Sequence, residues 1–169
     1  MDKNIIWIDE NENDLGEVSV LRAHQEGLLH RISVVYLTDD KNQILIQKRD
    51  DGRLDHSAAG HVDAGESYLK AAKRELEEEL GVSGVELTKV GNCDSKENGG
   101  KIRHKFEVFQ CKANPGELNP NEVEEVFWAD PGKIWNDMTG NDGDKKYCGG
   151  FRSTLELFLK ESQNLSKKI

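Results

Sequence analysis

The sequence predicts an α/β fold in which helices cover both faces of a mixed β-sheet, an α/β/α sandwich. Three observations favour it: paired strand-like segments, one central helix with an apolar stripe, and a closing helix near the C-terminal end. The 169 residues suit one compact domain with a sizeable core. We therefore expect a single domain over residues 1–169, with an N-terminal extension at about 1–28, before the first clear strand.

The first part of the chain carries the pattern of a β-hairpin. Residues 30–37 are rich in β-branched types, and a polar turn separates them from a second strand-like segment at 43–48. Residues 5–8 form only a short apolar run, and the segment 18–29 is ambiguous.

A helix is predicted over residues 67–80, because apolar side chains recur there at helical spacing. These are Leu69, Ala72, Leu76 and Leu80. Gly81 follows as a stop signal. The remaining predicted elements are strands at 85–93, 101–113 and 125–129, a small helix at 131–136 and a final helix at 151–165.

The overall charge is acidic, with a net charge of −9 and a pI near 5.1. Such a chain is not built to bind nucleic acid polymers or anionic membranes by bulk attraction. No apolar stretch approaches the roughly 20 residues that span a bilayer. The three cysteines form no CxxC pair, which favours reduced thiols. We expect a soluble, cytoplasmic protein.

Three glutamates lie together on the predicted helix. Glu75, Glu78 and Glu79 are spaced i, i+3 and i+4, so they share one face, where like charges repel. They also lie near the helix C-terminus, where the dipole disfavours anions. A divalent cation on this face would explain the cluster, and oxygen ligands suit Mg²⁺, or Mn²⁺ in its place. The charge pattern alone favours the alternative, a solvated acidic face.

The wider pattern around these glutamates resembles the Nudix box of the Nudix hydrolase family. That box reads glycine, five residues, Glu, seven residues, then Arg-Glu-aliphatic-x-Glu-Glu-x-Gly-aliphatic. All nine positions match without a gap: Gly60, Glu66, Arg74, Glu75, Leu76, Glu78, Glu79, Gly81 and Val82. The resemblance implies the Nudix fold, in which the box forms a loop–helix–loop packed between strands. It is highly specific, because nine positions agree over 23 residues.

The resemblance also implies catalytic roles for residues of the box. Glu75 and Glu79 would be the main metal ligands, with Glu78 as a further ligand or a base that orients water. Arg74 would orient the carboxylates, although a helix salt bridge with Glu78 is an alternative role.

Other positions would support the site structurally or complete the metal shell. Glu66 would anchor the helix start, Gly60 would allow close backbone approach, and Gly81 would end the helix. The carbonyl of Ala59 would add a metal ligand. A later loop often supplies another carboxylate in this family, and Glu122 is preferred here. The other loop candidates are Glu124 and Glu125, and each of the three has solvent exposure as its alternative.

The region before the box resembles a Nudix subgroup related to isopentenyl diphosphate isomerase. The matching segments are Asp9 to Asn11, Ala23 and His24, Leu28 to Arg31, and Gly60 with His61. In the isomerase, histidines at three comparable places bind a metal, so His24, His30 and His61 could bind one here.

Two departures from the isomerase count against its chemistry. Ala58 and Ala59 stand where the isomerase has a catalytic Cys before the glycine, and the hydrolase box is complete. The histidines are then expected to be structural or to face the substrate. His56 and His104 are expected to be ordinary core or surface residues.

The sequence therefore predicts a metal-dependent hydrolase that cleaves a diphosphate linkage in a small, nucleoside diphosphate-type molecule. His61, Lys48 and Arg49 are the substrate-binding candidates, with surface solubility as the alternative for the last two. An isomerase-like enzyme and a non-catalytic nucleotide-binding module are the alternative functions. A homodimer is expected only because symmetric pairs are the commonest oligomers.

Overall fold

A computed structural model of the chain describes residues 3–97, 100–140 and 143–166. The elements of its first half are β1 (Asn4–Ile8), β2 (Asp14–Ser19), α1 (Val20–Glu26), β3 (His30–Thr38), β4 (Ile44–Arg49), β5 (Leu54–Asp55), β6 (Ala58–His61) and α2 (Tyr68–Leu80). The second half contains β7 (Thr88–Glu97), β8 (Ile102–Lys112), β9 (Val123–Ala129), α3 (Pro131–Thr139), the short 3₁₀ helix η2 (Gly143–Lys146) and α4 (Phe151–Ser166).

The described strands form one mixed sheet around β3. This strand pairs in parallel with β8 and antiparallel with β1, β4 and β6. β7 extends the sheet beyond β8, and β9 extends it beyond β4. β3 is buried along nearly its whole length, as expected for a strand covered on both faces.

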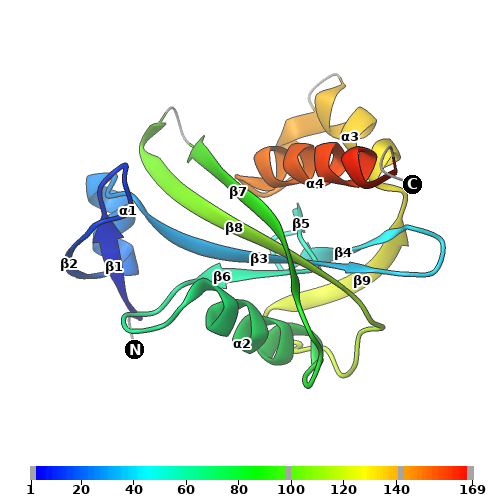
Figure 1. The fold of residues 1–169 in the computed structure, drawn as a ribbon, viewed down its shortest axis with the longest axis horizontal. Coiled ribbons are helices and arrows are strands. Elements are labelled where there is room, and N and C mark those ends of the chain that lie inside the picture. Colours follow the sequence, from blue (N-terminus) through cyan, green and yellow to red (C-terminus); the bar gives the residue numbers. More distant parts are fainter. Residues whose placement is uncertain (1–2, 98–99, 141–142, 167–169) are drawn as a thin grey trace.

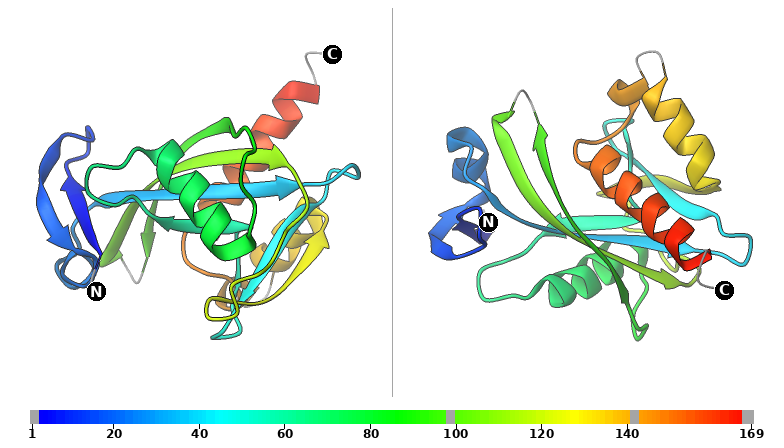
Figure 2. Two further views of the ribbon diagram at one scale, coloured as in Figure 1. Left: turned by 90° about the horizontal axis from the view of Figure 1, so that it is seen from below. Right: turned by 45° about the horizontal axis from the view of Figure 1, so that its top comes forward.

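Helices cover both faces of the sheet, which confirms the predicted α/β/α sandwich (Figure 1). Val34 and Tyr36 of β3 point into a core shared with Phe151 of α4. Val35, on the opposite face, packs into a second core shared with Leu76 of α2. In the left view of Figure 2, α2 lies in front of the sheet, and the right view shows α3 and α4 on the other side.

The helix α2 has well-defined ends. The Ser67 hydroxyl accepts a hydrogen bond from the Lys70 amide and caps the first turn. Gly81 ends the helix in the left-handed conformation with φ of 62°, and a Cβ there would lie 2.7 Å from the Glu117 carbonyl oxygen. Only glycine therefore fits this position well.

One residue of the predicted apolar stripe lies elsewhere. Leu69 is 42% exposed, whereas Ala72, Leu76 and Leu80 are buried. The inward face also includes Glu75 and Glu79, so it is rotated away from Leu69. The prediction for Leu69 was wrong because apolar spacing alone did not indicate that Glu75 and Glu79 belong to the inward face.

The N-terminal segment belongs to the same sheet. β1 and β2 form an antiparallel pair, and Trp7 of β1 pairs with His30 at the start of β3. The ambiguous segment 18–29 contains the end of β2 and the short helix α1. Ile5, Val18 and Ala23 form a small separate core under this segment. None of the described helices is long and apolar enough to cross a membrane.

Candidate functional site

A cavity of about 390 Å³ opens where the N-terminal segment, β6 and α2 meet. Its lining combines three kinds of polar group. The carboxylates are Glu75, Glu79, Glu122 and Asp55; the cationic side chains are Lys3, Arg49 and Arg53; and the imidazoles are His24, His56, His61 and His104. A polar cavity with clustered titratable groups is the expected form of a binding or catalytic site.

Glu75 reaches the cavity because Gly60 has no side chain. A Cβ at Gly60 would lie 2.1 Å from the Glu75 carboxyl carbon, so the Glu75 side chain would have to move away from β6. The Glu75 side chain is buried, and burial raises its pKa although the Arg74 guanidinium opposes that rise.

Arg74 joins the box into one unit. Its guanidinium donates to the Glu75 carboxylate, to both oxygens of Glu66 at 2.9 and 3.0 Å, and to the His61 carbonyl oxygen at 3.0 Å. The Glu66 carboxylate also accepts from the Asp63 amide at 3.2 Å, in the loop before α2. Arg74 thereby fixes α2 to that loop and to β6.

Glu79 is the second buried carboxylate of the cavity. It accepts hydrogen bonds from the Gln47 amide at 3.1 Å and from the Ala59 backbone N–H at 3.3 Å. Burial, together with the charges of Glu75 and Asp55, raises its pKa to about 8. A raised pKa means that the surroundings do not fully compensate the negative charge, which is the condition that a bound cation would relieve.

Glu78 lies differently from the other two box glutamates. Its side chain is 46% exposed and stands at the edge of the cavity, 3.3 Å from Arg74 and 3.9 Å from Lys3. The three carboxylates therefore share a helix face only loosely. Glu75 and Glu79, spaced i and i+4, turn inward, and Glu78 lies about 60° around the helix from Glu75 and about 100° from Glu79.

The three candidate glutamates near the start of β9 lie in different surroundings. Glu122 lines the cavity with Ala59 and Gly60, and its charge contributes to the raised pKa of Glu79. Glu124 and Glu125 instead approach Lys48, at 2.9 and 3.8 Å.

The two basic residues predicted to bind substrate, Lys48 and Arg49, also lie in different surroundings. Lys48 is engaged by Glu124 and Glu125 and does not line the cavity, whereas Arg49 does. Arg49 pairs with Asp55 at 3.2 Å, and its buried Nε has no hydrogen-bond partner among the described residues.

Two cationic side chains of the site were not singled out in the sequence. Arg53 follows a polar turn, and Lys3 stands near the start of the chain, so neither belongs to a motif. Their position depends on how β5 and the N-terminal segment fold against the box, which local sequence does not encode.

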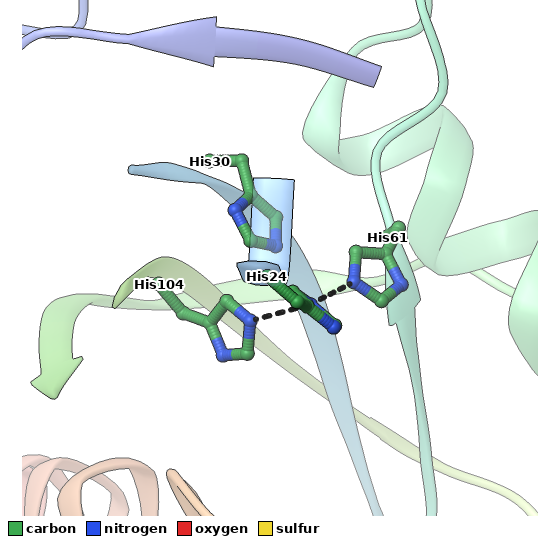
Figure 3. Close-up of side chains that lie close together, drawn as sticks. All are labelled: His24, His30, His61 and His104. Carbon is green, nitrogen blue, oxygen red and sulfur yellow. Dashed lines mark hydrogen bonds between the residues drawn. The ribbon is translucent and has the colours of Figure 1, made fainter. Parts of the chain in front are cut away.

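Four of the five histidines lie together (Figure 3), and three of these four, His24, His61 and His104, line the cavity. His24, His30 and His61 were considered as a group from the sequence, but His104 was expected to be an ordinary residue. That expectation was wrong, because the parallel register of β3 and β8 places His104 directly opposite His30. Burial lowers the pKa of His30 to about 3 and that of His61 to about 2, so both imidazoles are neutral near pH 7.

The fifth histidine lies in the core, as expected. The His56 ring contacts the Asp55 carboxylate through Nδ1 at 2.6 Å and the Thr154 hydroxyl through Nε2 at 2.7 Å. These contacts hold the pKa of buried Asp55 down at about 2, against the effect of burial.

Comparison with known proteins agrees with this geometry. The family model of the NUDIX domain matches residues 28–148. An uncharacterised Nudix hydrolase of Yersinia pestis is 34% identical over 75% of this chain and 72% of its own length. The uncharacterised Nudix hydrolase YfcD of Escherichia coli K12 is 32% identical over 76% of each chain. An isopentenyl-diphosphate Delta-isomerase of Serratia proteamaculans is 32% identical over 83% of this chain and 84% of its own.

Solved structures share the fold. A protein of Deinococcus radiodurans superimposes with a TM-score of 0.73 at 20% identity, covering 91% of this chain and 97% of its own. A MutT protein of Methanosarcina mazei gives a TM-score of 0.61 at 18% identity, covering 80% and 94%. The family model, the relatives above 30% identity and the complete box together establish that this chain belongs to the Nudix hydrolase family.

Proposed function

We propose that this chain is a metal-dependent hydrolase that cleaves the diphosphate linkage of a small, nucleoside diphosphate-type substrate. The observation that carries the proposal is the pair of buried carboxylates, Glu75 and Glu79, which line one cavity and whose pKa values are both raised. Buried carboxylates whose negative charge is not fully compensated by the protein are expected where a cation binds during function.

The donor set fits Mg²⁺, with Mn²⁺ as a substitute. Glu75 and Glu79 would be the main ligands, and the Ala59 carbonyl, Glu122 and, from the edge, Glu78 would complete the set. All donors are oxygens, which Mg²⁺ prefers, and the close approach at Gly60 leaves room for the Glu75 carboxylate. When bound, the metal would neutralise charge on the diphosphate and lower the pKa of a water molecule.

The chain's own residues would orient the reaction. Arg74 holds the Glu75 carboxylate and the His61 carbonyl, so α2 and β6 keep one relative position. Arg49 and Arg53 line the same cavity and offer guanidinium groups for phosphate oxygens. Glu78, which lies 3.3 Å from Arg74 and 3.9 Å from Lys3, would orient the attacking water or accept its proton.

The alternative of isomerase chemistry has one structural observation in its favour. Cys148 lines the cavity, although Ala58 and Ala59 occupy the positions before Gly60. Burial and the charge of Asp55 raise the pKa of the Cys148 thiol, so a reactive thiolate is disfavoured. Hydrolysis therefore accounts better for the complete box, and rearrangement becomes an outcome of the test.

The test is a hydrolysis screen with matched variants. Wild type, Glu79→Gln and the control Glu77→Gln would be incubated with nucleoside and isoprenoid diphosphates and Mg²⁺ or Mn²⁺, with EDTA as the metal-free arm. Glu77 lies on the exposed face of α2, so its variant removes the same charge from the same helix outside the cavity.

We expect metal-dependent cleavage in wild type and Glu77→Gln, and a loss of about 10²- to 10⁴-fold in Glu79→Gln. A rearranged isoprenoid product would replace the proposal by isomerisation. Binding of the panel without turnover would replace it by a binding module.

A further inference from the structure

Four imidazoles from separate elements converge at the edge of the cavity. His24 comes from α1, His30 from the start of β3, His61 from the end of β6 and His104 from β8. One ring nitrogen of each lies within 4.8 Å of the other three. Figure 3 shows the four rings turned toward one another, with His24 between His61 and His104.

His30 presents an unprotonated nitrogen to this cluster. Its Nδ1 lies 2.7 Å from the Leu28 carbonyl oxygen, which can only accept, so Nδ1 carries the proton. The neutral ring, which complete burial favours, then has a lone pair on Nε2. That Nε2 is buried and has no hydrogen-bond partner among the described residues. A histidine whose other N–H donates to a backbone carbonyl is the usual arrangement of a metal ligand.

The contacts of His24 also fit a metal ligand better than a hydrogen-bonded side chain. Its Nε2 lies 3.3 Å from the Nε2 of His61 and 3.5 Å from the Nε2 of His104. An imidazole nitrogen has either one proton or one lone pair in the ring plane, so it cannot make two good hydrogen bonds. Four nitrogens around Zn²⁺ at tetrahedral geometry would be about 3.3 Å apart, given Zn–N distances near 2.0–2.1 Å.

We propose that His24, His30, His61 and His104 bind one divalent transition-metal ion of the zinc class, separate from the cation of the box carboxylates. An all-nitrogen set suits Zn²⁺ or Co²⁺ and does not suit Mg²⁺, which prefers oxygen. Four protein ligands close a tetrahedral shell, which is the form of a structural metal site. The site also differs from the three histidines of the isomerase resemblance, because His104 supplies a fourth imidazole.

The ion would fasten the N-terminal segment to the sheet. α1 has only seven residues above a core of three buried side chains, so a metal ligand on α1 would add a direct link to the sheet beside the pairing of β1 with β3. His24 is the ligand from this segment, and the other three ligands come from sheet strands. The same segment brings Lys3 within 3.9 Å of both Glu75 and Glu78.

The test is a Co²⁺ titration of the full chain, followed by visible absorption and by metal analysis after gel filtration. Wild type is expected to bind one Co²⁺ per chain at the histidines, with the intense visible bands of low-coordinate cobalt. His24→Gln and His104→Gln are expected to bind it more than about 100-fold more weakly, because even indirect support of a ligand is worth 10- to 100-fold. Glu79→Gln is the matched control and should keep the wild-type bands.

Histidine ring ¹⁵N spectra of wild type with Zn²⁺ provide a readout that needs no variant. The ring signals of His24, His30, His61 and His104 should shift, whereas His56 serves as an internal control, since its ring contacts Asp55 and Thr154 instead.

Visible bands that are absent in wild type, or unchanged in both histidine variants, would overturn the inference. So would ring signals that Zn²⁺ leaves in place. The proposed hydrolysis would survive those results, because its own test uses the Glu79 variant and Mg²⁺.

Discussion

The carboxylate site and three of the four clustered histidines line the same cavity, but the two groups are assembled in opposite ways. Glu75 and Glu79 come from one helix, are acidic groups whose pKa values are raised, and are held by Arg74, Gln47 and the Ala59 amide. The histidines come from four elements, and His30 and His61 are held neutral by burial. Among the described residues, the histidines form a group whose ligand atoms all lie within 4.8 Å, and the three box glutamates do not form such a group.

The difference suggests two modes of metal binding. Converged neutral ligands fit an ion that stays in place, whereas buried carboxylates with raised pKa values fit a cation that arrives with an anionic substrate. Each of the following changes separates the two regions, from the largest expected effect to the smallest.

Gly60→Ala should damage the carboxylate site most. The new Cβ would collide with the Glu75 carboxyl group, displacing it by about 1 Å or more, and such misplacement can cost about 100-fold in turnover. Overpacking should also lower the free energy of unfolding by about 1–3 kcal/mol. Steady-state kinetics and urea unfolding measure the two effects.

The control for this change is Gly132→Ala. A Cβ there meets only the end of the Asp130 side chain, so activity should be retained. Wild-type turnover in Gly60→Ala would show that Glu75 does not need the space beside β6.

The same two regions show what local sequence can predict. The helix α2 was predicted because helical spacing and Gly81 are local signals, and the box was identified by resemblance because its nine positions lie within 23 consecutive residues. His104 was missed because its position depends on the register of β3 against β8, whose paired residues lie 74 positions apart in the sequence. Arg53 and Lys3 were missed for a similar reason, since tertiary packing alone brings them to the cavity.

Arg49→Met and Lys48→Met should separate the two predicted phosphate-binding residues. Loss of a charge-assisted hydrogen bond costs about 1.5–3 kcal/mol, so Arg49→Met should raise KM by roughly 10- to 100-fold. Lys48 faces Glu124 outside the cavity, and its variant should change KM by less than about threefold. Thermal melts would control for the loss of the Arg49–Asp55 pair. Equal effects of the two variants on KM would contradict the assignment of Arg49, and not Lys48, to the substrate.

Mg²⁺ affinity should rise with pH, up to about tenfold per unit, and level off above pH 8. Glu79 has a pKa of about 8 in the metal-free fold, above its ordinary value of 4.5, so protons compete with the metal below pH 8.

The same pKa shift makes the stability of the metal-free protein depend on pH. The contribution of Glu79 to the free energy of unfolding is full below about pH 4.5 and is lost as pH rises through about 8.

Calorimetric titrations with Mg²⁺ at pH 6, 7, 8 and 9 measure how the Mg²⁺ affinity changes with pH. Glu79→Gln should flatten this dependence, and Co²⁺ binding at the histidines should not depend on Glu79 at any of these values. A wild-type affinity that stays constant over this range would mean that Glu79 does not bind the metal.

The smallest expected effect is a coupling between the two metals. Arg74 donates both to the Glu75 carboxylate and to the backbone carbonyl of His61, so it links the carboxylate site to a proposed zinc ligand. An ion that immobilises His61 should improve Mg²⁺ affinity by about fivefold, near the lower limit of typical coupling energies, and by reciprocity Mg²⁺ should improve zinc affinity equally. Arg74→Lys replaces the guanidinium, which makes the two contacts through separate nitrogens, by a single ammonium nitrogen and should weaken the coupling. Identical Mg²⁺ affinities with and without zinc in wild type would mean that binding at the carboxylates and binding at the histidines are not thermodynamically coupled.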